Sequence, residues 1–157
     1  MLKFPIITEV VQIIADRLLP PVVMISGFFD PVQDGHLSYL KQAIISANAL
    51  ICVIGSDKQL LMKKGKVNIP EDGRREIIDL LLHGLKIRHL TIINIWDTET
   101  TLVAKALRAQ KPDIFFRGGD KTLESMPSEE RKVCDELKIK ILHATLEKAR
   151  HGKNMQL

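Results

Sequence analysis

The stretch that decides the fold reads VVMISGFFDPVQDGHLSYLKQAI and covers residues 22–44. Its first residues, 22–26, form a short apolar run with two valines at the start, which predicts a buried strand. Residues 27–35 form a loop with a glycine at each end, and apolar residues recur at helical spacing after it. These apolar residues are Leu37, Leu40, Ile44 and Ala47. A strand, a tight loop and a helix in this order are typical of an α/β unit.

The same alternation of strand and helix continues along the chain. Further strands are expected at 50–54, 89–95, 113–116 and 139–143, and further helices at 70–82, 100–110 and 128–137. We expect the lysine-rich residues 56–68 to form a loop that is in part helical. Residues 8–19 predict one more helix before the first strand, because Thr8 is a suitable N-cap and Pro20 and Pro21 end the pattern.

This order of elements predicts an α/β fold, a Rossmann-like doubly wound parallel sheet of five strands with helices on both faces and an extra N-terminal helix. We expect a single domain over residues 1–157, with a helical extension at 1–20, a core at 21–143 and a basic tail at 144–157. In such sheets ligands bind beyond the carboxyl ends of the strands.

Composition narrows the class of protein. The chain has 157 residues, 45% apolar and 27% charged, which is ordinary for one globular domain. Its net charge of +4 suits a phosphate site, while its lysines and arginines are too spread out to favour nucleic acid. Cys52 and Cys134 are isolated, and the histidines lack ligand spacing, so we expect no disulfide framework and no protein-held metal. No signal peptide or membrane span is expected, which favours a cytoplasmic location.

The loop at 27–35 has chemistry of its own. Gly27 allows a ligand to approach the backbone closely. Gly35 and His36 lie at the expected helix start, where free N–H groups and the helix dipole favour an anion. An imidazole there can donate a hydrogen bond to a phosphoryl oxygen, and this bond strengthens if charge develops on the oxygen. The residues alone leave open a plain strand–turn–helix connection capped by Asp34.

This loop resembles the G-x-F-D-x-x-(H/T)-x-G-H motif of the cytidylyltransferase-like nucleotidyltransferases, which are relatives of the class I aminoacyl-tRNA synthetases. The matching residues are Gly27, Phe29, Asp30, Gly35 and His36. Residues 30–32 and 35–37 are similar to the phosphopantetheine adenylyltransferase version of the motif. The resemblance extends over about 22–143.

Three features depart from the family pattern. Gln33 replaces the first His or Thr of the motif, and it can donate a hydrogen bond to phosphate but carries no charge. Phe28 replaces a small or hydroxyl residue that often helps to bind phosphate in the family. The family usually ends in a run of Ser and Thr that binds the triphosphate, and residues 152–156 are similar only to the segment that leads into it.

A second loop follows the fourth expected strand and reads RGGDK over residues 117–121. Asp120 is suited to accept a hydrogen bond from a ribose hydroxyl or a base amine, and Arg117 to contact a phosphate or base, although an ordinary turn would also explain these residues. With 124–137, the loop resembles the heptose-1-phosphate adenylyltransferase branch, and glycerol-3-phosphate cytidylyltransferases are related. The first of these branches uses ATP, so ATP is favoured over CTP.

The lysine segment 63–66 precedes Pro70 and Arg74 and, read alone, is most simply a solvated loop. The family carries a mobile K-G segment here, followed by P-x-x-x-R, and its lysine reaches the triphosphate and the acceptor phosphate. Lys64 and Arg74 fit that pattern, with Lys63 and Lys66 as rivals for the lysine.

Together these resemblances imply a nucleotidyltransferase that moves a nucleotidyl group, by preference adenylyl, from an NTP to a phosphorylated small molecule such as a sugar phosphate. They imply His36 and Lys64 as catalytic residues and Mg²⁺ bound with the nucleotide. A non-catalytic nucleotide-binding module on the same fold is the alternative, and a homodimer remains open. The implied nucleotide-binding residues are Gly27, Phe28, Phe29, Asp30, Gln33, Gly35, Arg74, Arg117, Gly118, Gly119 and Asp120.

Overall fold

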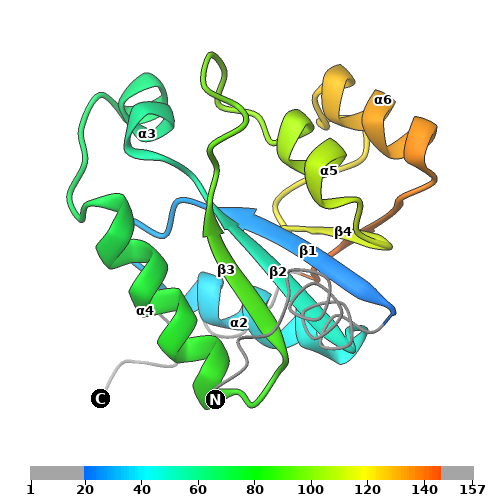
Figure 1. The fold of residues 1–157 in the computed structure, drawn as a ribbon, viewed down its shortest axis with the longest axis horizontal. Coiled ribbons are helices and arrows are strands. Elements are labelled where there is room, and N and C mark those ends of the chain that lie inside the picture. The colour runs from blue at the N-terminus through cyan, green and yellow to red at the C-terminus, as the bar shows by residue number, and fades with distance from the viewer. Residues whose placement is uncertain (1–19, 146–157) are drawn as a thin grey trace, which may run out of the picture.

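The computed structural model describes residues 20–145, which form a parallel sheet covered by helices (Figure 1). The predicted helix at 8–19 and all but the first two residues of the basic tail lie outside this part of the chain. The strands are β1 (Val22–Gly27), β2 (Ala49–Ile54), β3 (His89–Ile93), β4 (Ile114–Arg117) and β5 (Lys140–His143). The helices are α2 (Asp34–Ile45), α3 (Asp57–Lys64), α4 (Glu71–Gly84), α5 (Ala104–Gln110) and α6 (Ser128–Leu137). None of these helices has the length and apolar character that a membrane crossing requires.

All five strands are parallel, in the order β3-β2-β1-β4-β5. The chain runs outward from β1 through β2 to β3, and then returns to the other side of β1 to form β4 and β5. This reversal places the topological switch point between β1 and β4, where open α/β sheets usually bind ligands. The predicted Rossmann-like, doubly wound fold is confirmed.

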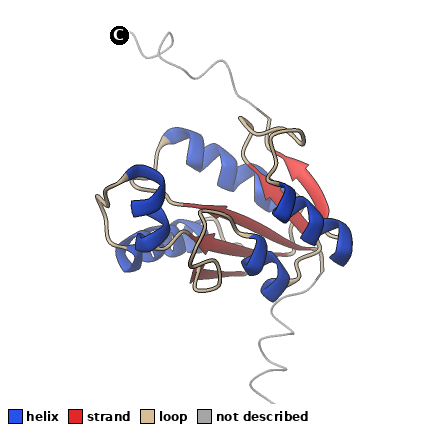
Figure 2. Ribbon diagram, turned by 90° about the horizontal axis from the view of Figure 1, so that it is seen from above, coloured by secondary structure: helices blue, strands red, loops and turns tan. Residues whose placement is uncertain are grey.

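Each face of the sheet is buried under its own pair of helices (Figures 1 and 2). Side chains alternate along a strand, so Val23 and Ile25 of β1 point to one face and Met24 to the other. The first face packs against α2 and α4, through residues such as Leu40 and Leu82. The second packs against α5 and α6, through side chains that include Leu107 and Val133. Burial on both faces explains why the strands read as continuous apolar runs.

Residues 57–64 form the helix α3, where the sequence analysis expected a loop in part helical. The cause is a capping box that the lysine-rich composition obscured. The hydroxyl of Ser56 accepts a hydrogen bond from the Gln59 backbone N–H at 3.1 Å, and Gln59 Oε1 accepts one from the Ser56 N–H at 3.3 Å. Gly65, with φ of 74°, ends the helix in the left-handed conformation that glycine adopts easily.

Two boundaries between β3 and α5 also differ from expectation. Strand β3 ends at Ile93 rather than at residue 95, because the side-chain oxygen of Asn94 accepts the backbone N–H groups of Trp96 and Asp97 in a turn. Helix α5 begins at Ala104 rather than at residue 100. The carboxylate of Asp97 accepts hydrogen bonds from the backbone N–H groups of residues 105 and 106. It therefore caps the helix although it lies seven residues before the helix start.

A pair of leucines on α4 tests this assignment of faces. Leu82 is fully buried against the sheet, whereas Leu80, on the same helix, is 65% exposed. We expect Leu82→Ala to lower the free energy of unfolding by about 2–5 kcal/mol, because it leaves a cavity in the core. The matched Leu80→Ala should change it by no more than about 0.5 kcal/mol. Urea denaturation of both variants checks this, and equal losses would contradict the described orientation of α4.

Candidate functional site

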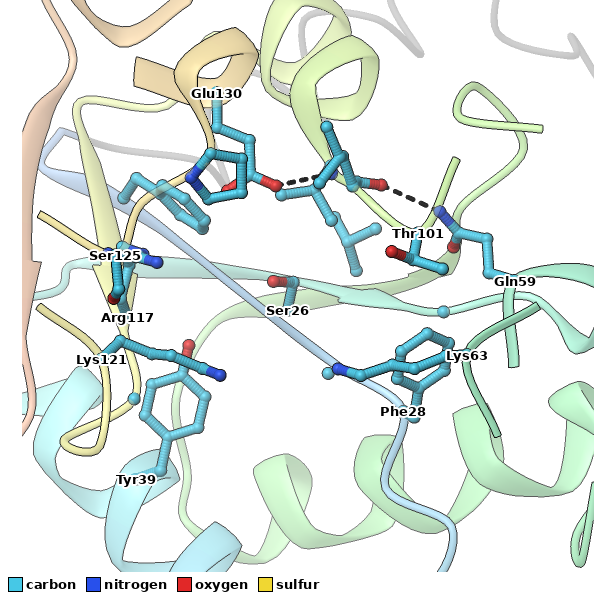
Figure 3. A pocket seen from close by; sticks show the side chains of 18 residues that line it. Ser26, Phe28, Tyr39, Gln59, Lys63, Thr101, Arg117, Lys121, Ser125 and Glu130 are labelled. Carbon is cyan, nitrogen blue, oxygen red and sulfur yellow. Dashed lines mark hydrogen bonds between the residues drawn. The ribbon is translucent and has the colours of Figure 1, made fainter. Parts of the chain in front are cut away.

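A cavity of about 330 Å³ opens at the carboxyl ends of β1, β2 and β4, at the switch point of the sheet (Figure 3). Ser26, Val53 and Phe115 contribute to its wall from the strands. The rest of the wall comes from the loops after β1, β2, β3 and β4, from Tyr39 of α2, from α3 and from the start of α6. A volume of this size is within the range of about 300–1,000 Å³ that small-molecule sites occupy.

The loop after β1 folds over its own aromatic residue. Phe29 has φ of 53° and its ring lies beneath Gly27, where a Cβ would come within 2.8 Å of the ring. Glycine is therefore required at 27 for this conformation. Phe29 is buried, and its ring meets that of His36 edge-on at a centroid distance of 5.1 Å. Gly27 lines the cavity, while Phe29 is buried and packs against the ring of His36.

Asp30 of the same loop is engaged by backbone groups. Its carboxylate oxygens accept the N–H groups of Asn68 at 2.8 Å and Ile69 at 2.7 Å. Burial tends to raise the pKa of Asp30, but these two hydrogen bonds and the charges of Arg74 and Lys64 outweigh it, and the pKa is lowered. Asp30 is thus an anion that ties this loop to the segment before α4, and the structure gives it a positioning role in place of the expected direct contact with a nucleotide.

Arg74, expected to contact the triphosphate, is fully buried within the protein. Its Nη1 donates to the carbonyl oxygens of Phe28 at 3.0 Å and Gly55 at 2.7 Å. Its Nε donates to the carbonyl of Ile69 at 2.7 Å, and its Nη2 to the carboxylate of Asp57 at 2.7 Å. These contacts make Arg74 a positioning residue that joins four segments, and this corrects the expectation of a direct phosphate contact.

His36 lies in the first turn of α2, as the sequence predicted. Its Nδ1 accepts a hydrogen bond from the backbone N–H of Gln33 at 2.9 Å. Burial, followed by the charge of Lys64, lowers the pKa of His36, which favours the neutral ring. With Nδ1 acting as an acceptor, the ring proton belongs on Nε2, which can then donate. The backbone N–H of Gln33 therefore sets the tautomer of His36. A Cβ at Gly35 would meet no atom within 4 Å, so there is open space for a ligand at this end of the helix.

The adjacent lysines at the end of α3, Lys63 and Lys64, lie near different parts of the site. Lys63 lines the cavity, and its Nζ lies 5.2 Å from the centroid of the Phe28 ring. Phe28 can take this position because residue 55 is glycine, where a Cβ would come within 2.3 Å of the ring. Lys64 is exposed, and its charge acts on His36 and Asp30. Of these two lysines, Lys63 lines the cavity, although the sequence analysis favoured Lys64 over it. The charge of Lys64 acts instead on His36.

Of residues 117–120, at the end of β4 and in the loop after it, only Arg117 and Gly118 line the cavity. Arg117 lines the cavity and is buried, and its Nη1 donates to the carbonyl of Thr122 at 2.7 Å. Gly118 also lines the cavity. At Gly119 a Cβ would lie 2.8 Å from the carbonyl oxygen of Ala144, so glycine permits this loop to approach the end of β5. Asp120 is exposed at the rim, 3.8 Å from Lys121.

Several residues that line the cavity were not predicted as site residues. Gln59 and Glu130 are buried, and both are held by hydrogen bonds to the segment 100–103. Burial raises the pKa of Glu130, and its Oε2 accepts the N–H of Val103 at 3.1 Å. Tyr39, taken as a packing residue, stacks on Phe116 but also lines the cavity. The capping pattern S-D-K-Q was the one sequence signal for this group, since it places Gln59 in the first turn of α3.

A doubly wound sheet with a cavity at its switch point is the architecture of α/β proteins that bind small ligands at this place. Residues 24–154 match the model of the cytidylyltransferase-like family, and the chain belongs to this family. The bifunctional protein HldE of Psychromonas ingrahamii is 32% identical over 124 residues, which cover 77% of this chain and 24% of that protein. HldE of Shewanella sediminis is 29% identical over 122 residues, with the same coverage of 77% and 24%. The chain thus spans about a quarter of the length of these relatives.

Solved structures share the fold at lower identity. A lipopolysaccharide core biosynthesis protein from Thermoplasma volcanium is 23% identical, with a TM-score of 0.59, over 79% of this chain and 95% of that one. The pantoate-β-alanine ligase of Francisella tularensis, solved with β-γ ATP and β-alanine, is 15% identical, with a TM-score of 0.58, over 88% of this chain and 65% of that one. At these identities the likeness shows a common fold.

The role of Arg74 can be tested on the protein without ligand. We expect Arg74→Ala to lower the free energy of unfolding by about 3–5 kcal/mol, because it leaves buried carbonyl groups without a donor and breaks the pair with Asp57. Arg75→Ala, at the half-buried neighbour, is the control and should cost less than about 1 kcal/mol. Chemical denaturation gives both values. If Arg74→Ala kept the stability of the wild type and lost only triphosphate affinity, Arg74 would be a ligand contact after all.

Proposed function

We propose that this protein is an NTP-dependent nucleotidyltransferase that transfers a nucleotidyl group to a phosphorylated small molecule and releases pyrophosphate. The observation that carries the proposal is the state of His36. Its Nδ1 is held by the Gln33 N–H, so its Nε2 proton is available at the open start of a helix. Membership of the cytidylyltransferase-like family and the cavity at the switch point support the same activity.

The reaction needs no nucleophile from the protein, because the acceptor already carries a phosphate anion. An oxygen of that phosphate attacks the α-phosphorus of the NTP in line, a new P–O bond forms, and the bond to the departing pyrophosphate breaks. The protein's contribution is to position the two substrates and to stabilise charge on the oxygens at the α-phosphorus. Nε2–H of His36 donates to one of these oxygens, and the charge of Lys64 acts on the same region.

The cavity, whose wall does not include His36, supports the binding of a nucleotide. Phe28, Val53 and Phe115 provide apolar surface, while Gln59 and Glu130 provide polar groups that the segment 100–103 holds in place. The similarity of residues 117–120 to an adenylyltransferase motif favours ATP over CTP. The acceptor that we propose is a sugar phosphate or a similar phosphorylated small molecule.

Magnesium would enter bound to the phosphates of the NTP. Within residues 20–145, no three His, Cys, Asp or Glu side chains lie close enough together to hold a metal ion. The described cavity wall contains the carboxylate of Glu130, one oxygen of which already accepts the Val103 N–H. This donor set fits Mg²⁺ that would be held mainly by phosphate and water, because Glu130 is the one carboxylate among the described lining residues. When bound, the metal neutralises charge on the phosphates.

A non-catalytic nucleotide-binding module is the second candidate. Phe28 favours it, because an aromatic ring beside Gly55 takes the place of the hydroxyl that often binds phosphate in the family. Gln33 favours it as well, since its side chain carries no charge. Release of pyrophosphate from ATP in the presence of a panel of phosphorylated acceptors separates the two candidates. Tight ATP binding with no release for any acceptor would support the binding module.

The nucleotide preference can be measured by thermal denaturation. A ligand that binds only the folded state raises the melting temperature in proportion to its binding free energy. We expect ATP to raise it more than CTP at equal concentration, with Mg²⁺ present in both samples. Equal or greater stabilisation by CTP would reverse the assignment to adenylyl transfer.

The role of His36 can be tested with His36→Asn. The side-chain oxygen of Asn is placed to accept the Gln33 N–H as Nδ1 does, whereas the donor at Nε2 is lost. We expect turnover, measured as pyrophosphate release, to fall by a factor of about 10²–10³. The affinity for a non-hydrolysable ATP analogue should change only modestly, because interactions that strengthen in the transition state act on rate. His83→Asn, at an exposed histidine of α4, is the control. Unchanged turnover in His36→Asn would remove His36 from the mechanism.

A further inference from the structure

Two lysines face each other across the cavity. Lys63 projects from α3 and Lys121 from the loop after β4, and their ammonium groups point toward one another (Figure 3). Lys63 is held in this direction by its contact with the ring of Phe28. Lys121 lies near Asp120 on the opposite rim, at 3.8 Å, where water weakens the attraction between them. Two like charges on opposite sides of one cavity repel each other, and an anion between them would remove that repulsion.

The charges around this pair are unbalanced. Burial lowers the pKa of Lys63, and the charges of Lys121 and Lys64 lower it further. Asp120 and Glu130 act in the opposite direction on the pKa of Lys63, but the pKa stays lowered. Arg117 adds a third cation to the wall, but its Nη1 already donates to Thr122. The ammonium groups of the two lysines are therefore the donors placed to meet an anionic ligand, with three N–H groups each.

This pair is separate from the position at His36. Successive residues of an α-helix point in directions about 100° apart, since the helix has 3.6 residues per turn. Lys63 consequently faces the cavity and Phe28, whereas the charge of Lys64 acts on His36 and Asp30. One short helix thus supplies a cation to each of two places. A transfer between two phosphate-bearing substrates requires two such places.

We propose that Lys63 and Lys121 form a clamp for a phosphate group in the cavity, distinct from the position beside His36. The assignment rests on the proposed function, because it takes the ligands to be an NTP and a phosphorylated acceptor. The clamp binds a phosphate by charge-assisted hydrogen bonds from two sides. That phosphate belongs either to the nucleotide or to the acceptor, and the two sources share this chemistry.

The test measures dissociation constants by calorimetry for Lys63→Ala and Lys121→Ala. The probes are α,β-methylene ATP for the nucleotide and inorganic phosphate for the phosphate of the acceptor. We expect each variant to bind at least one of the probes about tenfold more weakly, which is the effect of losing a hydrogen bond from a charged donor. Lys132→Ala, at an exposed lysine of α6, is the control and should bind both probes as the wild type does.

The pattern of losses identifies the source. Weaker binding of α,β-methylene ATP alone places a nucleotide phosphate between the lysines, and weaker binding of inorganic phosphate alone places the acceptor there. Unchanged dissociation constants for both probes in both variants would overturn the clamp. Melting temperatures near that of the wild type confirm that the variants are folded, as expected for lysines at the rim of a cavity.

Protection from acetylation gives a readout that does not depend on the variants. Saturating probe should slow the acetylation of Lys63 and Lys121 in the wild type, as followed by mass spectrometry, and leave Lys132 unaffected. Equal rates with and without both probes would also overturn the clamp. The clamp and the proposed transferase activity can be refuted independently of each other. Pyrophosphate release by the wild type with unaltered binding in both lysine variants refutes the clamp alone, and lysine-dependent binding without release for any acceptor refutes the transferase alone.

Discussion

The buried guanidinium of Arg74 is the interaction on which the site depends. Its four described hydrogen bonds reach the loop after β1, the end of β2, the start of α3 and the segment before α4. The opposite charge comes from Asp57, whose side chain is 37% exposed, so the pair keeps contact with water at one end. The loop after β1 carries Phe28 and leads into His36, and α3 carries both lysines. One buried side chain, which bonds to the backbone of the wall residues Phe28 and Gly55, therefore ties these segments together.

Much of the fold could be predicted because it follows from local patterns. Apolar runs alternate with segments of helical spacing, and the parallel sheet follows from that order. The elements that were misjudged have causes outside those patterns. Helix α3 depends on a capping box that its lysines obscured, and the start of α5 depends on Asp97, seven residues before it. Composition and periodicity contain little information on either.

The site was predictable as a set of residues and less so as an arrangement. Motif positions identified Gly27 and Arg117, which line the cavity, and His36, which lies in the first turn of α2. A motif cannot tell whether a polar side chain faces the ligand or the protein, since that depends on which segments pack around it. For this reason Arg74 was expected at the phosphates but is buried, and Lys63 could not be separated from Lys64 until the helix phase of α3 was known.

The eight-residue length of α3 has a mechanical consequence. Its first turn is fastened by Ser56, Asp57 and Gln59, and its last turn holds Lys63 and Lys64 at a fixed angle to one another. A rotation of this helix about its axis that brings one ammonium group nearer to a ligand swings the other group through the same angle. If both lysines bind phosphate groups, their two ligands would be coupled through the position of this one helix, without any movement of the sheet.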